Sequence, residues 1–383
     1  MEFSKIKRFG NVIHNVEFDK NIRLEKLLSR MEKVLTNNGF LKCHIPQVDY
    51  PSRFVGENDS EGINDLYKPI GGDGRILALP NEPTIALMNS LLLRRDEIAR
   101  YFGETETYSF LKPINPQNGY YLTAVLTNAN GYEAEAEMCG LAIELAESIG
   151  IKTPLKLGNT EIAQGVVDFY LQRTETRDKV RKISSGDVQS EGEFAAAQIF
   201  SDMKKINEAS MMAYVQELSK KLDNKRSIDG VVDVYEVLNR LDAQNKMSEV
   251  SVDPLYVGEG DFASGMTFRL GEDAPVIFGG RQVYVNGGEA MGVVTLTVDL
   301  MQLASLLGTL PKEQPRKVEI LVSDSFVAYQ KSLKFKADFL KNGLVSYVSY
   351  KVSPEEADRR IAERNGNEYL VVYITEDGGL KHN

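Results

Sequence analysis

Apolar residues recur at helical spacing along much of the first third of this chain. Between residues 18 and 38 they fall on one face, and Gly39 follows where a helix would end. The same spacing predicts helices over 84–100 and 133–150, the second closed by its own terminal glycine. These three segments are expected to pack an apolar stripe against a core.

Strand-like patterns separate these helices. Residues 40–50 indicate a strand interrupted by Pro46, and residues 65–79 a hairpin around Gly71-Gly72-Asp73-Gly74. A β-like run covers 119–129, whereas residues 160–250 contain helical patterns alone. Further predicted elements are strands at 266–270, 275–280 and 282–286 and a helix near 299–307. The block 160–250 therefore reads as a helical insertion between two β-rich halves.

The last part of the chain has a different order. Residues 316–383 alternate strand, helix, strand, helix and strand, which predicts a small α/β domain. Residues 311–315 lie in a stretch with two prolines and several charges and are expected to be a linker. We therefore assign 1–310 to a larger core, with the insertion at about 160–250, and 316–383 to a second domain.

Composition narrows the functional classes. The chain has 383 residues, 42% hydrophobic and 26% charged, with no apolar run long enough for a bilayer and no apolar core of a signal peptide. With Cys43 and Cys139 the only cysteines and three histidines in all, a reduced cytoplasmic protein without a metal site is expected. The net charge of −10 argues against a general nucleic-acid-binding surface.

Motifs that would reveal the chemistry directly are absent. No phosphate-binding loop, dinucleotide fingerprint or Ser-His-Asp context occurs, and the acidic tract at 133–139 is expected on a solvated helix face. The stretch LALPNEPTIAL, residues 77–87, places Glu82 and Thr84 at a strand–helix junction. Glu82 is a candidate pocket carboxylate, and helix capping by Thr84 or Asn81 is an equally complete explanation of the junction.

Several weak motifs occur together in one order. LALPNEPT at 77–84, PQNGYY at 116–121, GEGDFASG at 258–265, FGGRQV at 278–283 and GVVTLTVDL at 292–300 resemble the motifs of a class II aminoacyl-tRNA synthetase of the histidyl type. The resemblance runs from about residue 18 to the end. It implies an α/β (α+β) fold with a mixed, mainly antiparallel sheet, a helical insertion and an anticodon-binding-like C-terminal domain.

The departures from that family concern its arginines. Fixed guanidinium groups suit amino-acid activation because they bind phosphate and carboxylate oxygens bidentately. Where the resemblance leads us to expect arginine, this chain has Pro80, Gly258 and Asp299. The motif-2 arginine has no clear equivalent, with Lys112 or Thr107 nearest. The adenylation chemistry of the family is therefore expected to be lost, and we assign no catalytic residue and no cofactor.

The amino-acid pocket of the family is altered as well. Phe262 and Ala263 stand where the resemblance leads us to expect paired tyrosines, so hydroxyl groups suited to an imidazole are missing. The residues that could still bind histidine or a similar small polar ligand are Glu82, Thr84, Asn128, Asn130 and Arg281.

Regulatory subunits of ATP phosphoribosyltransferase are synthetase-like proteins that fit this combination. The resemblance to them implies a non-catalytic protein that activates a short catalytic phosphoribosyltransferase subunit and mediates feedback by histidine. It also implies a homodimer within a hetero-oligomer, formed through residues 18–55, with no tRNA ligand. A divergent histidyl-tRNA synthetase or related ligase is the alternative, and a synthetase-like binding or scaffold protein is a second one.

Overall fold

The computed structural model describes residues 18–55, 62–91, 98–108, 119–128, 131–174, 176–207, 209–221, 224–258, 263–271, 275–286, 289–306, 317–341, 344–364 and 369–382. The chain divides into two compact units, Met1–Thr309 and Leu310–Asn383, and the predicted linker 311–315 lies outside the described residues.

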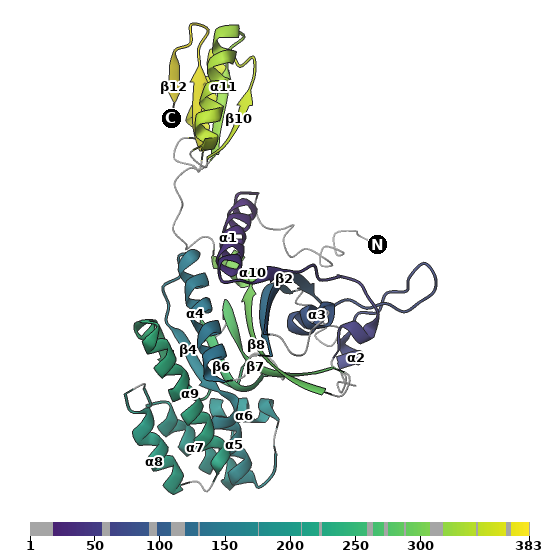
Figure 1. The fold of residues 1–383 in the computed structure, drawn as a ribbon, viewed down its shortest axis with the longest axis vertical. Coiled ribbons are helices and arrows are strands. Elements are labelled where there is room, and N and C mark those ends of the chain that lie inside the picture. The colour runs from purple at the N-terminus through teal and green to yellow at the C-terminus, as the bar shows by residue number, and fades with distance from the viewer. Residues whose placement is uncertain are drawn as a thin grey trace. The chain divides into compact units, whose positions relative to one another are not determined.

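A large mixed sheet forms the centre of the first unit (Figure 1). Its order in the described residues is β1-β2-β3-β8-β7-β6-β4-β5. The β1–β2 and β4–β5 pairs are parallel, and the other pairs are antiparallel. The strands are β1 (Leu41–Lys42), β2 (Ala99–Thr107), β3 (Gly119–Thr127), β4 (Leu155–Asn159), β5 (Val250–Val252), β6 (Ala263–Leu270), β7 (Ile277–Asn286) and β8 (Glu289–Asp299).

The strand register sets which side chains share a face of this sheet. Residues opposite one another in neighbouring strands point to the same side, and successive residues alternate. Val125 and Val293 pack with Ala86, Leu87 and Met88 of α3 (Pro83–Ser90), so we call their side the α3 face. The other side is the α4 face, because it is covered by α4 (Tyr132–Ser148).

Two arginines confirm the assignment of the α4 face. Arg100 of β2 binds Glu137 of α4 with Nε–Oε1 at 2.8 Å, and Arg281 of β7 binds Glu135 of α4 at 2.6 Å. Their strand neighbours, Leu126 and Val294, lie opposite one another in register. The helices α1 (Phe18–Asn37) and α10 (Leu300–Leu306) pack against each other, α1 also packs against α4, and a short helix α2 (Gly62–Asp65) precedes α3.

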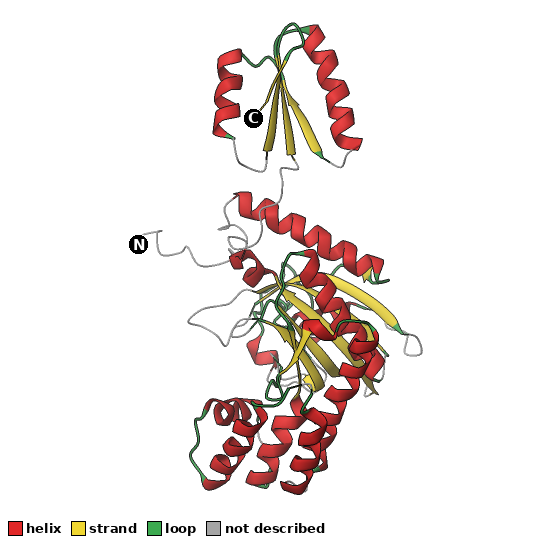
Figure 2. Cartoon of the chain, turned by 90° about the vertical axis from the view of Figure 1, so that its left-hand side faces the viewer, coloured by secondary structure: helices red, strands yellow, loops and turns green. Residues whose placement is uncertain are grey.

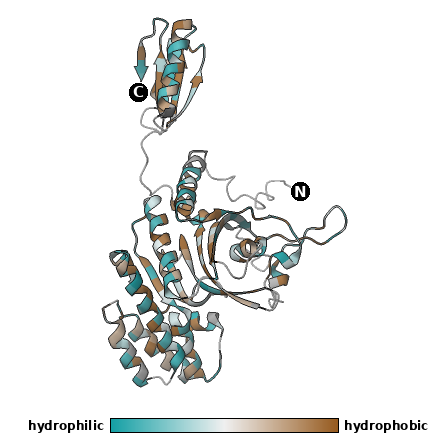
Figure 3. Ribbon diagram, viewed as in Figure 1, coloured by the Kyte–Doolittle hydropathy of each residue, from teal (hydrophilic) through white to brown (hydrophobic). Residues whose placement is uncertain are grey.

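Helices occupy the segment between β4 and β5. They are α5 (Thr160–Leu171), α6 (Arg177–Ser185), α7 (Glu191–Met203), α8 (Met211–Lys221) and α9 (Lys225–Ala243), followed by the 3-10 turn η3 (Met247–Glu249). Side-chain oxygens of Asn159, Thr176, Ser190 and Asn224 cap four of these helices. Hydrophobic and hydrophilic residues alternate along them (Figure 3), so each helix buries one side against its neighbours.

The second unit has a four-stranded sheet in its described residues, in the order β10-β9-β11-β12. Its elements are β9 (Lys317–Val322), α11 (Phe326–Lys341), β10 (Val345–Ser349), α12 (Pro354–Glu363), β11 (Tyr369–Ile374) and the antiparallel β12 (Leu380–His382). Apolar clusters place Phe335 of α11 on one face and Ile361 of α12 on the other (Figure 2). The predicted strand–helix alternation is found, and β12 is an addition to it.

Three predicted boundaries are wrong. The helix expected over 84–100 ends at Ser90, and Ala99–Arg100 already belong to β2, where Arg100 pairs with Leu126. Strand pairing overrides the helical spacing of these residues. The predicted strand 40–50 is regular over Leu41–Lys42, and the two strands expected at 275–286 form the single strand β7.

Candidate functional site

The junction in LALPNEPT is held from both sides. The carbonyl oxygen of Pro80 accepts a hydrogen bond from the Tyr108 backbone N–H at 2.7 Å, just beyond the end of β2. Glu82 then adopts extended backbone angles and is the N-cap of α3, with Pro83 at the first helical position. Its Oε2 accepts from the backbone N–H of Ile85 at 2.5 Å. Glu82 is therefore the cap that we had expected of Thr84 or Asn81.

The surroundings of Glu82 are polar but poorly hydrated. Burial raises the pKa of Glu82, and hydrogen bonds from Ile85 and Thr84 offset part of that effect. Thr84 is buried, and its hydroxyl interacts with the Glu82 carboxylate. The buried Oδ1 of Asn81 has no hydrogen-bond partner among the described residues. A carboxylate and an amide oxygen that lack full solvation suit a ligand that donates hydrogen bonds, such as an ammonium group.

Arg281 lies on the other side of the sheet from this junction. Its Nε donates to Glu135 Oε1 at 2.6 Å and its guanidinium also donates to the Gly131 carbonyl at 3.2 Å. Both contacts are on the α4 face, whereas Glu82 begins the helix that covers the α3 face. The structure therefore does not bring Arg281 together with Glu82 and Thr84.

Asn128 lies far from Glu82 along the sheet. In the β2–β3 pair Thr107 is opposite Gly119 at one end and Ala99 is opposite Thr127 at the other. Glu82 lies near the Thr107 end, because Pro80, two residues before it, is hydrogen-bonded to Tyr108. Asn128 directly follows Thr127 and therefore lies at the opposite end. Asn128 has a positive φ of 56° and its N–H donates to Gly292. Asn130 lies outside the described residues, as do Lys112 and Phe262.

Two acidic groups, the buried Glu135 and the partly buried Asp233, lie beside Arg281. Glu135 is 5% exposed, so the expectation of a solvated helix face is wrong for this residue. Burial raises the pKa of Glu135, and Arg281 partly offsets that rise. Asp233 of α9, hydrogen-bonded by Tyr132 and Asn159, has its pKa raised by burial too and interacts with the charge of Arg281.

Helix geometry indicates that Glu135 points to the interior, which the acidic composition of this tract does not reveal. Residues two apart on an α-helix differ by about 200° in direction. Glu135 therefore cannot share a face with Glu133 and Glu137. Glu133 forms an ion pair with Arg240 at the surface, and Glu137 forms a partly exposed ion pair with Arg100. An E-A-E-A-E run on an amphipathic helix must bury one of its glutamates or leave its apolar stripe incomplete.

The residues that stand in place of the expected arginines support the fold locally. Asp299 ends β8, and its Oδ1 accepts from the N–H groups of Met301 and Gln302 at 2.8 and 2.9 Å, at the start of α10. Burial raises the pKa of Asp299. The carbonyl of Gly258 accepts from Arg181 of α6 at 3.1 Å. Thr107, one of the two candidates for the motif-2 position, is buried.

Arginines in the described strands of the large sheet are committed to carboxylates. Arg100 and Arg281 bind Glu137 and Glu135 on the α4 face. Arg269, on the α3 face, binds Asp253 with Nη2–Oδ2 at 2.8 Å and lies over the ring of Tyr256. No described strand therefore presents an uncommitted guanidinium to a phosphate at this sheet.

Further features limit the chemistry of the described regions. They contain no group of three or more His, Cys, Asp or Glu side chains arranged to hold a metal ion. Cys43 is half-buried and Cys139 buried, both as free thiols, and burial raises the pKa of each. None of the described helices is long and apolar enough to span a membrane.

Curated proteins similar to this chain carry two kinds of name. The ATP phosphoribosyltransferase regulatory subunit of Clostridium kluyveri is 22% identical over 93% of this chain and 95% of its own length. Its counterpart in Acetivibrio thermocellus is 22% identical over 96% and 91%. The histidine–tRNA ligase of Haloarcula marismortui is 20% identical over 41% of this chain and 38% of its own length.

Solved structures and a family model complete the comparison. Histidyl-tRNA synthetase from Nostoc sp. PCC 7120 superposes with a TM-score of 0.73 and 17% identity over 95% of this chain and 93% of its own. An ATP phosphoribosyltransferase regulatory subunit/histidyl-tRNA synthetase from Bacillus halodurans C gives 0.65 and 13% over 94% and 96%. The expected class II synthetase-like fold and the resemblance to the regulatory subunits are thereby confirmed. The family model described as histidyl-tRNA synthetase matches residues 13–303, and this chain belongs to that family.

Proposed function

We propose that this protein is a non-catalytic regulatory subunit that assembles with, and activates, a separate short-form catalytic ATP phosphoribosyltransferase in histidine biosynthesis. The observation that carries the proposal is the use of Pro80, Gly258 and Asp299 at positions where the synthetase resemblance leads us to expect arginine. Asp299 caps a helix with its carboxylate, and a carboxylate at this position would repel a triphosphate.

The lengths over which relatives align support the same choice. Relatives named as regulatory subunits match between 85% and 96% of this chain, whereas the histidine–tRNA ligase of Haloarcula marismortui matches 41%. A chain that keeps the whole architecture and lacks the activating arginines is suited to binding and assembly. A divergent synthetase remains the competing function because the family model carries that description.

Histidine feedback would act through the polar groups at the start of α3. The half-buried Glu82 carboxylate, the Thr84 hydroxyl and the unpartnered Oδ1 of Asn81 together suit the ammonium group of an amino acid. Because Arg281 lies on the opposite face of the sheet and Asn128 follows the far end of β3, we restrict the proposed contacts to Glu82, Thr84 and Asn81. Asn130 lies outside the described residues. We propose histidine as the ligand because the product of a pathway is the usual feedback signal for its first step.

Residues 18–55 are the proposed homodimer surface. Leu41, Val48 and Tyr50 are 64%, 48% and 46% exposed, which is unusual for apolar side chains so close together in sequence. A second copy would remove this surface from water.

Phosphoribosyltransferase assays test the main proposal. A short catalytic subunit should show little activity alone, regain it when this protein is added, and lose it again when histidine is added. Activity that does not depend on this protein would overturn the proposal. Histidine-dependent exchange of pyrophosphate into ATP that persists after any contaminating synthetase has been removed would favour the ligase instead.

A thermal-shift assay tests the proposed ligand contact of Glu82 separately. A ligand that binds the folded state raises the midpoint of unfolding by mass action. Histidine should raise it for the wild type and for Asp73→Asn, an exposed carboxylate in the nearby turn, and much less for Glu82→Gln. Equal shifts in all three proteins would exclude Glu82 as a contact.

A further inference from the structure

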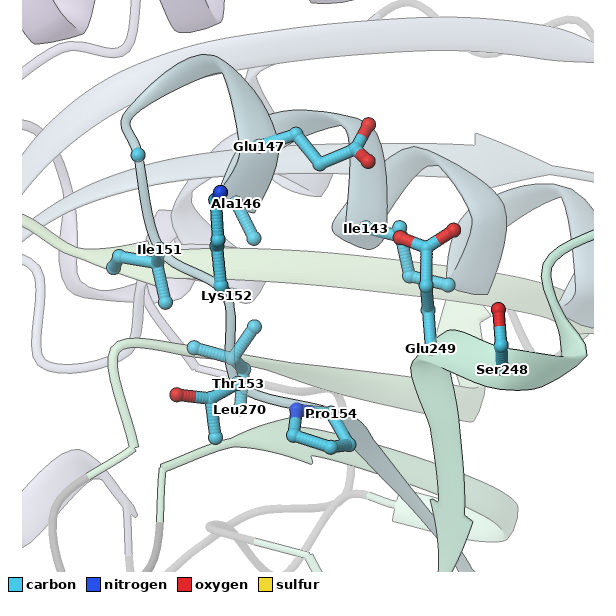
Figure 4. A pocket seen from close by; sticks show the side chains of 11 residues that line it. Ile143, Ala146, Glu147, Ile151, Lys152, Thr153, Pro154, Ser248, Glu249 and Leu270 are labelled. Atoms are coloured by element: carbon cyan, nitrogen blue, oxygen red, sulfur yellow. The ribbon is translucent and has the colours of Figure 1, made fainter.

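A cavity lies at the end of α4 opposite to Glu135. It has a volume of about 380 Å³, in the range of small-molecule sites. Its walls come from the end of α4, the loop into β4, the turn η3 and the end of β6 (Figure 4). Ile143, Ala146 and Leu270 form an apolar floor, with Ile151 and Pro154 beside them.

Two carboxylates face this cavity. Figure 4 shows Glu147, on the last turn of α4, and Glu249, on η3, extending over the same opening. The charge of Glu147 and a side-chain hydrogen bond with it add to the effect of burial in raising the pKa of Glu249, so the two carboxyl groups lie close together. Like charges held this close over an apolar floor favour the arrival of a cation between them.

Neighbouring basic groups do not neutralise the pair. Lys246 partly offsets the raised pKa of Glu249, but its ammonium group donates to the Gly140 carbonyl and to Glu144, both at 3.0 Å. Lys152 lines the cavity with an exposed side chain. One lysine against two glutamates leaves the rim negative, and the carbonyl end of the α4 dipole has the same sign.

The geometry points to a binding site for a small organic cation, one with an ammonium or amidinium group on an apolar body. The charged group would lie between Glu147 and Glu249, and the body would cover Ile143 and Leu270 on the floor. Such a ligand would join the end of the helical insertion to the end of α4, because η3 directly follows α9. This proposal does not depend on the regulatory function.

Calorimetric titration of the full chain with benzamidine at low salt tests the site, with benzamide as the neutral analogue of the same shape. Wild-type protein should bind benzamidine saturably and benzamide much more weakly. The double variant Glu147→Gln/Glu249→Gln should lose at least about tenfold in affinity, because two charge-assisted contacts become neutral. Thr153→Phe, in the exposed loop that lines the cavity, should abolish binding by filling the space.

Asp242→Asn is the matched control, since it removes an exposed carboxylate of α9 outside the cavity. It should bind benzamidine as the wild type does, and thermal unfolding should show that each variant is folded. No saturable binding to the wild type would overturn the proposal. The proposal would also be overturned if the double variant and Thr153→Phe both bound benzamidine as tightly as the wild type does. Equal binding of benzamide and benzamidine to the wild type would overturn it too.

Discussion

Replacing Arg281 with methionine is the sharpest test of its ion pair with the buried Glu135. The change keeps most of the side-chain volume and leaves Glu135, whose side chain is 6% exposed, without its ion-pair partner at 2.6 Å. Removal of one member of a buried pair costs about 3–5 kcal/mol. We therefore expect Arg281→Met to lower the free energy of unfolding by roughly 3–4 kcal/mol at neutral pH, the lower part of this range.

Protonation of Glu135 sets an upper limit on that cost and gives it a pH dependence. Starting from an ordinary glutamate pKa of about 4.3, keeping the carboxyl neutral costs roughly 4 kcal/mol at pH 7.5 and roughly 2 kcal/mol at pH 5.5. The folded-state pKa of Glu135 is already raised in the wild type and would rise further in the variant. A raised pKa means that the native state binds more protons than the unfolded state, so the variant recovers stability as the pH falls.

Urea unfolding followed by circular dichroism at pH 7.5 and 5.5 measures both effects. Glu135→Gln/Arg281→Met should cost less than the sum of the two single changes, because no buried carboxylate remains. Lys221→Met, which breaks the exposed pair of Lys221 with Glu217, should leave the stability close to that of the wild type. A loss below about 1 kcal/mol for Arg281→Met, or one that is the same at both pH values, would refute the reasoning.

Three further predictions concern single groups. Asp299→Ala should destabilise the first unit by about 1 kcal/mol in urea unfolding, because it removes the two hydrogen bonds at the start of α10. Glu319→Gln should cost the second unit about 3 kcal/mol, seen as faster hydrogen exchange in β9, because Glu319 is 2% exposed and binds Arg360 at 2.9 Å. Tyr108 should titrate at a pKa of about 12 in NMR spectra of labelled tyrosines, since burial and the nearby Glu106 carboxylate oppose its ionisation. Glu106→Gln should lower that pKa.

Local patterns were sufficient for the helices with a clear apolar stripe. The segments 18–38 and 133–150 correspond to α1 and α4 within two residues at each end, because helical spacing is a property of neighbouring residues. Strand boundaries depend on partners distant in sequence. Helical spacing predicted that Ile98–Arg100 belong to a helix, whereas the pairing of Arg100 with Leu126 places Ala99 and Arg100 in β2.

The candidate site was less predictable for a related reason. The order of the motifs predicted that Glu82 and Arg281 belong to one ligand site. Whether two residues share a site depends on the face of the sheet to which each side chain points. A shift of one residue exchanges the faces, and Gln282, not Arg281, points to the side covered by α3. Glu135 was overlooked because composition marked the tract as acidic without showing which glutamate turned inward.

These placements support the proposed regulatory function. On the α3 face, the arginine of the described strands is held by Asp253, and the partly buried carboxylates of Glu82 and Asp299 would repel phosphate. The same carboxylates favour a positively charged group, and Glu82 is anchored by Ile85 so that it does not have to reorganise on binding. The proposed site, which repels triphosphate and suits an ammonium group, fits a protein that senses an amino acid better than one that activates it.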